Sequence, residues 1–190
     1  MDRLPSAPSS ASLQPAPLCD TGSGELNFTW ETYHRLIEHL ALQVHHGASR
    51  FDQIVALSRG GLRVGDALSR LFHKPFVVMA ASSYGGDDAR SRGELTLGSQ
   101  LAHTCPSLGP RLLLVDDLAD SGATLLASRH WLKENLEVDA VATAVLWLKA
   151  SSTIQPDYWA MGLPNNPWIL QPFEQWETLP LEQLHPMSQA

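Results

Sequence analysis

Residues 112–124 read LLLVDDLADSGAT, and this stretch decides the fold. Four consecutive apolar residues predict a strand that is buried on both faces, and the strand is expected to end at the first of two acids, Asp116. The segment that follows is polar and small, with Gly122 near its end. A helix is expected over about 123–134, so the stretch predicts a strand, a polar loop and a helix in succession.

The same alternation of strands and helices extends to both sides of this stretch. Further strands are predicted over 53–57, 76–80 and 140–148, and further helices over 33–44 and 64–72. Segment 82–93 is polar and contains glycine, which predicts a mobile loop, and the proline-containing chain after Lys149 is expected to be irregular. The pattern predicts an α/β fold with a mainly parallel twisted sheet that is flanked by helices.

Length and composition narrow the class of protein. The chain has 190 residues, of which 44% are hydrophobic, and this fits one ordinary domain with a buried core. Residues 1–26, rich in Pro, Ser and Ala, are predicted to form a disordered tail, and 27–190 the domain. The net charge of −7 argues against a nucleic-acid partner. We expect a soluble cytoplasmic protein that has no signal peptide, no membrane segment and two free thiols, Cys19 and Cys105.

Polar clusters follow directly on three of the predicted strands, at 58–61, at 116–124 and at Lys149. In open α/β sheets, ligands bind outside the carboxyl ends of the strands, so we expect these clusters to meet. Backbone N–H groups around Gly122, at a helix N-terminus, suit a phosphate, and Ser121 and Thr124 add hydroxyl donors. The carboxylates of Asp116 and Asp117 suit the hydroxyls of a ribose. A ribose 5-phosphate site is therefore predicted; the structural alternative is a helix capped by Asp120 beside two exposed acids.

Two other functions of such an acid-rich loop are excluded by its sequence. The loop lacks the Gly-Lys-Ser/Thr ending that a Walker A motif requires. A response-regulator receiver carries paired acids on its first strand, whereas the pair here follows the third predicted strand.

Residues 113–124 resemble the phosphoribosyl pyrophosphate (PRPP) signature of type I phosphoribosyltransferases, and 58–62 resemble the pyrophosphate loop of the bacterial xanthine-guanine enzymes in that family. The resemblance implies that Asp116 and Asp117 hold the ribose hydroxyls and that Asp120 lies near the reacting centre. It implies a non-proline cis peptide at Ser58–Arg59, with Arg59 acting in catalysis. It also implies Mg²⁺ on the pyrophosphate, with Asp117 as a protein ligand. The remaining PRPP-binding residues implied by the resemblance are Ser58, Gly60, Gly61, Ser121, Gly122, Ala123 and Thr124.

The acceptor site is also implied by the resemblance. Lys149 would donate to the 6-oxo group of a purine, Trp168 would stack on its ring, and backbone near Ile169 would read the 2-position. Tyr84 would belong to a flexible lid that closes over the site, and a small C-terminal hood would complete it. Leu170 stands where the xanthine-guanine enzymes carry an acid, which leaves the choice among guanine, xanthine and hypoxanthine open.

The resemblance as a whole implies a purine salvage enzyme that transfers a phosphoribosyl group from PRPP to a 6-oxopurine, as a homodimer or homotetramer. Two alternatives remain open. The same fold serves PRPP-sensing regulators of nucleic acid, against which the acidic charge argues. A transferase with a pyrimidine or another amine as acceptor would use the same sugar-phosphate residues, because fold alone does not settle function.

Overall fold

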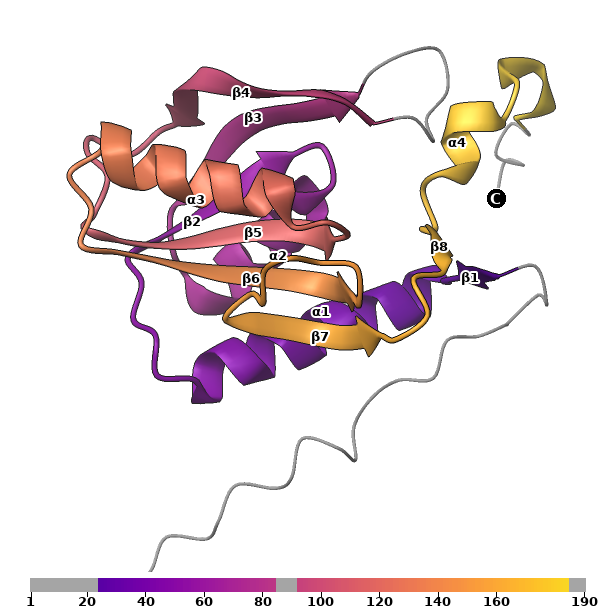
Figure 1. Cartoon of the computed structure of the whole chain (residues 1–190), viewed down its shortest axis with the longest axis horizontal. Coiled ribbons are helices and arrows are strands. Elements are labelled where there is room, and N and C mark those ends of the chain that lie inside the picture. The colour runs from indigo at the N-terminus through magenta and orange to yellow at the C-terminus, as the bar shows by residue number, and fades with distance from the viewer. Residues whose placement is uncertain (1–23, 85–91, 185–190) are drawn as a thin grey trace, which may run out of the picture. The chain divides into compact units, whose positions relative to one another are not determined.

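The computed structural model describes residues 24–84 and 92–184 (Figure 1). The described chain forms two units, which are treated separately: the first is 36–84 with 92–166, and the second is 24–35 with 167–184. Among the helices in these residues, none has both the length and the hydropathy that a membrane-spanning helix requires.

A six-stranded sheet forms the centre of the first unit (Figure 1). Its strands are β2 (Gln53–Ser58), β3 (Phe76–Tyr84), β4 (Arg92–His103), β5 (Arg111–Ala119), β6 (Ala140–Lys149) and β7 (Tyr158–Leu163). They lie in the order β4-β3-β2-β5-β6-β7, and all neighbours are parallel except β3 and β4. The predicted mainly parallel sheet is thus confirmed.

Helices α2 (Gly61–Phe72) and α3 (Ala123–Asn135) cover opposite faces of this sheet. Alternate residues of β2 face opposite sides, so Val55 belongs to the core cluster that includes Leu125 of α3, while Ala56 contacts the backbone of α2 at Gly65. Val55 and Leu125 are essentially inaccessible to solvent. Burial of each such side chain contributes roughly 1.5–3 kcal/mol to folding.

The strand order places a topological switch point between β2 and β5. From β2 the chain passes through α2 to β3 on one side, and from β5 it passes through α3 to β6 on the other. The two connections diverge at the shared carboxyl edge of β2 and β5, which leaves a crevice where ligands bind in doubly wound sheets. The loops that follow β2 and β5 are therefore the ones the fold brings together.

The second unit contains a small parallel sheet of β1 (Glu25–Asn27) and β8 (Trp168–Leu170), in which Glu25 pairs with Trp168. Helix α1 (Trp30–His46) begins in this unit, and the Thr32 N–H donates to the side chain of the predicted N-cap, Thr29, at 3.2 Å. A short helix, α4 (Gln175–Thr178), and a 3₁₀ turn, η2 (Leu181–Gln183), follow β8.

Two regions differ from the sequence prediction. Within the expected loop at 82–93, residues 82–84 continue β3 and residues 92–93 begin β4, which pairs antiparallel with β3; residues 85–91 lie outside the described residues. The expected irregular chain after Lys149 contains β7 and β8. Both β4 and β7 are edge strands, with a neighbouring strand on one side only. An edge strand tolerates polar residues and glycine, and these obscure the apolar pattern by which a strand is predicted from sequence. Of the predicted tail, residues 1–26, positions 1–23 lie outside the described residues.

Candidate functional site

The acid pair lies inside the second half of β5 rather than at its end. Asp116 is in register with Val145 of β6, and the Asp117 N–H donates to Asp116 Oδ1 at 3.0 Å. Burial raises the pKa of Asp116 well above its ordinary value, and the charge of Asp117 raises it further. A hydroxyl that donates to this carboxyl, or a cation beside the pair, would favour the ionised form. The pair is thus placed to respond to a bound diol or cation.

The loop that follows β5 turns sharply into α3. We call residues Asp120–Thr124 the Asp120 loop. Gly122 has a φ of 77°, in the left-handed region where a side chain is strained, and α3 begins at the next residue. The Ala123 N–H is 3.3 Å from Ser121 Oγ, and the Leu126 N–H donates to the Gly122 carbonyl at 2.9 Å. The loop is therefore a compact turn at a helix N-terminus, the geometry that favours an anion.

The loop after β2, residues Ser58–Gly61, packs directly against the acid pair, and we call it the Ser58 loop. A Cβ added at Gly60 would overlap the Asp117 carboxylate, and one added at Gly61 would lie 2.5 Å from the Val115 carbonyl oxygen. Only glycine permits this approach, so the two loops form one surface at the switch point. The peptide bond Ser58–Arg59 is cis, as the family resemblance implies.

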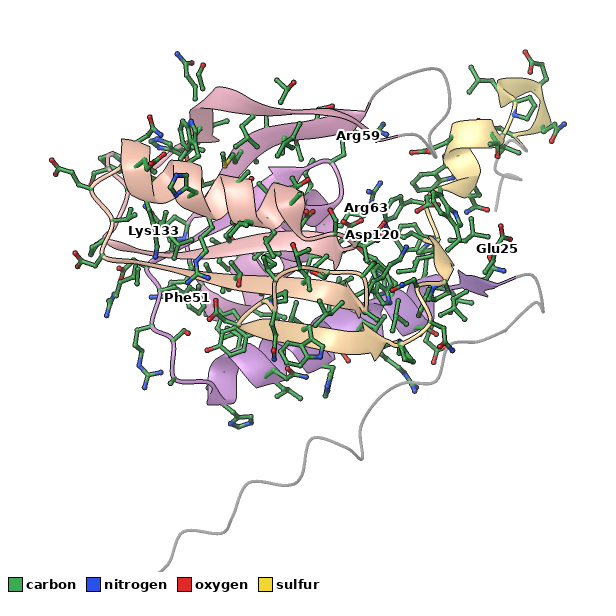
Figure 2. The ribbon with its side chains drawn as sticks, in the orientation of Figure 1. Glu25, Phe51, Arg59, Arg63, Asp120 and Lys133 are labelled. Atoms are coloured by element: carbon green, nitrogen blue, oxygen red, sulfur yellow. The ribbon has the colours of Figure 1, made fainter. Side chains whose placement is uncertain are left out.

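Cations lie at the same edge of the sheet. Figure 2 shows the side chains of Arg59 and Arg63 at the carboxyl end of the parallel strands, where Asp120 also lies. Lys149, the last residue of β6, is only 6% exposed, and its Nζ lies 3.5 Å from Asp120 Oδ2. This edge of the sheet therefore combines an acid pair, a helix N-terminus and basic side chains, a set that suits a phosphorylated sugar.

Within residues 24–84 and 92–184, no three His, Cys, Asp or Glu side chains gather so as to hold a metal ion. Asp116 and Asp117 supply only two carboxyls at the switch point. A divalent cation there would take most of its ligands from phosphate oxygens and water, which is the usual coordination of Mg²⁺ at phosphate sites.

A pocket of about 650 Å³ adjoins Lys149 in the first unit, and Ile154, Trp159 and Gly162 contribute to its lining. In the second unit, a pocket of about 550 Å³ is lined by Phe28, Trp30, Leu170, Gln171 and Glu174 among others. Both volumes fall in the range of small-molecule sites.

The remaining predicted base-binding residues belong to the second unit. Trp168 is 37% exposed and Ile169 is buried, and both lie in β8. Trp30 makes ring contacts with Phe173 and Trp176, with centroids 6.3 Å and 5.9 Å apart. Lys149 and Trp168 therefore come from different units, and each is placed within its own unit.

The structure brings together, in the first unit, the predicted residues of the Ser58 loop, the acid pair, the Asp120 loop and Lys149. The backbone of Tyr84 ends β3, and its side chain lies outside the described parts of the chain. Sequence reasoning missed Arg63, in the first turn of α2, and Ser151 and Thr153, which hydrogen-bond to the Asp120 loop. The only sequence signal for Arg63 was its position two residues after Gly61. The only sequence signal for Ser151 and Thr153 was the run of three hydroxyl residues at 151–153.

Comparisons with known proteins agree with this geometry. The profile of the phosphoribosyl transferase domain matches residues 29–176. The chain is 30% identical over 151 residues to a xanthine-guanine phosphoribosyltransferase of Idiomarina loihiensis, which covers 79% of this chain and 87% of the relative. A protein of the same name from Gluconobacter oxydans is 28% identical over 154 residues, covering 80% and 84%. The crystal structure of a purine phosphoribosyltransferase from Pyrococcus horikoshii superposes with a TM-score of 0.64 at 26% identity, covering 83% of this chain and 97% of that one.

Proposed function

Because the chain belongs to the phosphoribosyl transferase domain family and is a phosphoribosyltransferase, we propose that it transfers the 5-phosphoribosyl group of PRPP to a 6-oxopurine. The products are the purine nucleotide and pyrophosphate. One observation carries the proposal: the Ser58 loop, the acid pair and the Asp120 loop form one surface at the switch point, with Gly60 against the Asp117 carboxylate. The names of the relatives support a purine as the acceptor.

The sugar phosphate would lie along the end of β5. The 5-phosphate would accept hydrogen bonds from the backbone of Ser121–Thr124, at the N-terminus of α3, where the helix dipole favours an anion. Asp116 and Asp117, a few residues earlier in the chain and within β5, would accept hydrogen bonds from the ribose hydroxyls. A phosphate site and a diol site that adjoin along the chain suit ribose 5-phosphate.

Pyrophosphate would lie on the Ser58 loop. The small surface at Gly60 and Gly61 lets the backbone approach the phosphates, and Arg59 supplies a guanidinium for bidentate contact. Mg²⁺ would be held by the phosphates and hydroxyls of PRPP with Asp117 as its protein ligand, and would neutralise charge on the leaving group. Arg59 would hold the departing group in place at the same edge.

Asp120 is the group best placed for the chemical step. Its carboxylate belongs to the loop that would hold the 5-phosphate, and Lys149 Nζ lies 3.5 Å from Oδ2. Loss of pyrophosphate leaves positive charge at C1′ of the ribose, which an adjacent carboxylate stabilises, and the attacking purine must lose a proton. Asp120 would serve one or both of these needs. Tyr84, at the end of β3, is proposed as part of a lid that excludes water.

For the acceptor, we propose that Lys149 donates to the 6-oxo group, that Trp168 stacks on the ring and that backbone near Ile169 reads the 2-position. An ammonium at the end of a buried strand suits an oxo-substituted heterocycle, and the partial exposure of Trp168 leaves ring surface for stacking. Leu170 offers no acceptor for a 2-amino group through its side chain, so guanine, xanthine and hypoxanthine all remain candidates.

The proposal is tested by incubating the protein with PRPP, Mg²⁺ and each of six bases: guanine, xanthine, hypoxanthine, adenine, uracil and orotate. Nucleotide formation and pyrophosphate release are measured together. We expect product from one or more of the three 6-oxopurines and none above background from the other bases. If only uracil, orotate or adenine gave product, the 6-oxopurine would be wrong as the acceptor. If none of the six bases gave product although PRPP bound tightly, a PRPP-sensing role would be favoured.

A further inference from the structure

Residues Ser151–Ile154, which we call the brace, run from the end of β6 alongside the Asp120 loop in the first unit. Thr153 donates twice to the Ser121 carbonyl oxygen, from its backbone N–H and from its Oγ1, and both distances are 3.0 Å. Ser151 Oγ lies 3.0 Å from the Asp120 carbonyl oxygen and 3.1 Å from Asp120 Oδ1. Two consecutive carbonyl groups of the loop are therefore bound by the brace.

These contacts determine where the N–H groups of the loop point. In a trans peptide the C=O and the following N–H lie on opposite sides of the chain. The described chain has its single cis peptide elsewhere, at Ser58–Arg59. Because the carbonyls of Asp120 and Ser121 face the brace, the N–H groups of Ser121 and Gly122 face away from it. The brace thus turns two donors toward the side on which a phosphate would bind.

The brace also contacts the loop by packing. A Cβ added at Gly122 would lie 2.7 Å from Ser152 Oγ and 2.7 Å from Ile154 Cγ1. Ser152 Oγ in turn donates to the Ile154 carbonyl oxygen at 2.7 Å, which keeps the brace compact. The left-handed glycine is therefore required by its neighbour as well as by its own φ of 77°.

The brace is fixed at its other side by the end of the first unit. The Ser151 N–H donates to Asn166 Oδ1 at 2.8 Å, and the Ala150 N–H donates to the Leu163 carbonyl oxygen at 3.0 Å. Because the brace is hydrogen-bonded on both sides, it can hold the Asp120 loop in one conformation before a ligand binds. This lowers the entropy cost of ordering the loop when the ligand binds.

The Asp120 carboxylate is held at both oxygens. Ser151 Oγ is near Oδ1, and Lys149 Nζ is 3.5 Å from Oδ2. When a base engages Lys149, the serine contact would remain and would keep the carboxylate oriented. Ser151 therefore acts on the carboxylate and, through the Asp120 carbonyl, on one N–H group of the phosphate cradle, whereas Thr153 acts on the backbone alone.

We propose that Thr153 and Ser151 are positioning residues for the transfer reaction: Thr153 orients the Gly122 N–H toward the 5-phosphate, and Ser151 orients the Asp120 carboxylate together with the Ser121 N–H. This proposal rests on the proposed function, and it assigns different kinetic consequences to the two residues. Loss of the Thr153 hydroxyl weakens ground-state binding of the phosphate. Loss of the Ser151 hydroxyl chiefly slows turnover and weakens phosphate binding less than loss of the Thr153 hydroxyl, because its hydrogen bond is shared between the Asp120 carboxylate and the Asp120 carbonyl.

The test uses Thr153→Val and Ser151→Ala in the full chain, with Thr153→Ser as the conservative variant that restores the hydroxyl. Matched controls are Thr104→Val and Ser107→Ala, because both side chains are exposed in the loop between β4 and β5, at the opposite end of the sheet. Each variant is measured for kcat, for KM with PRPP, for ribose 5-phosphate affinity by calorimetry and for thermal midpoint.

We expect Thr153→Val to raise the KM for PRPP and the Kd for ribose 5-phosphate about threefold to tenfold, with kcat within about twofold. Thr153→Ser should restore both constants. Ser151→Ala should lower kcat about threefold to tenfold and raise the ribose 5-phosphate Kd by a smaller factor than Thr153→Val does, about twofold or threefold.

Two results would overturn the proposal. In the first, Thr153→Val and Ser151→Ala give the same kcat, KM and Kd as their control variants. In the second, each variant changes kcat, KM and Kd equally and also lowers the thermal midpoint, which would indicate a purely structural role. If the wild-type chain forms no nucleotide from any base, the proposed function fails by itself. The ribose 5-phosphate affinities then still decide the role of Thr153, because they require no acceptor.

Discussion

The sugar-phosphate region and the proposed base region of this protein are built in different ways. The sugar-phosphate region, 58–61 with 116–124, lies in one unit and follows two adjacent strands of one sheet. The residues proposed to bind the base are Lys149 in that unit and Trp168 and Ile169 in the other, and we call them the proposed base region. The sugar-phosphate residues are contiguous motifs that follow adjacent strands of one parallel sheet, whereas the proposed base-binding residues are far apart in sequence and belong to different units. Substitutions should therefore separate PRPP binding from base binding.

The largest effect is expected where the two regions meet, at Asp120. Asp120→Asn keeps the shape of the side chain and removes its charge, so kcat should fall about 100-fold or more. The Kd for PRPP should change by less than about twofold, since the backbone of the loop is kept. Steady-state kinetics and calorimetry measure the two constants, with Asp139→Asn, an exposed acid before β6, as the control. Full turnover in Asp120→Asn would refute the assigned role.

Asp117→Ala should damage the sugar-phosphate region alone. Removal of a carboxylate that accepts from ribose hydroxyls and ligates Mg²⁺ should weaken PRPP binding about 10- to 100-fold. The affinity is measured by calorimetry in the presence of Mg²⁺, and Asp139→Ala serves as the control. An unchanged Kd for PRPP would indicate that residues other than Asp117 bind the ribose hydroxyls.

Lys149→Met should damage the proposed base region. Methionine fills the buried position without the ammonium, so KM for the base should rise about tenfold while PRPP affinity stays within about twofold. A smaller decrease in kcat is also expected, because Asp120 loses its partner at 3.5 Å. The control is Lys133→Met, on exposed α3 surface far from the site (Figure 2). If PRPP affinity fell as much as base affinity, the two regions would not be separable.

Trp168→Leu should have a smaller effect of the same kind. Loss of an aromatic stacking partner should raise KM for the base about twofold to tenfold, with no change in PRPP affinity. Trp176→Leu is the comparison variant, because Trp176 is 56% exposed in the same unit and has no proposed role with the base. Equal effects of both substitutions would indicate that general packing of the second unit, not stacking, is being measured.

The smallest effect concerns stability. Burial raises the pKa of Asp116 above its unfolded value, so folding favours the protonated form, and this contribution is lost as pH rises through the folded pKa. Asp116→Asn should therefore raise the thermal midpoint at neutral pH by a few degrees, and this gain should shrink as the pH falls through the folded pKa toward the unfolded pKa, below which the wild-type carboxyl holds its proton in both states. Calorimetric scans across pH check this. A gain that grew toward acid pH would reverse the sign and contradict the raised pKa.

Much of the sugar-phosphate region could be predicted from sequence because each part is local. The apolar run at 112–115 specifies a buried strand, and Gly122 specifies the turn into α3. The extent of β5 could not be predicted, because pairing with β6 continues through Asp116 to Ala119. Likewise, the contacts of Ser151 and Thr153 with the Asp120 loop join residues about 30 positions apart, as in the Thr153–Ser121 pair, and no periodicity reports them.

The edge strands were missed for a related physical reason. A central strand such as β5 is buried on both faces and reads as a continuous apolar run, while β4 alternates polar and apolar residues and contains Gly93 and Gly98. Pairing with a neighbouring strand, β3 for β4 and β6 for β7, makes these segments strands, and that pairing is a property of the assembled sheet.

The most direct measurement is a calorimetric titration of Mg²⁺–PRPP into the wild-type chain in the absence of any base. If the sugar-phosphate region is complete within the first unit, PRPP binds saturably with one site per chain, ribose 5-phosphate competes, and Lys149→Met and Trp168→Leu bind as well as wild type. Absence of binding, or binding that requires a base, would contradict a sugar-phosphate site built at the switch point of the sheet.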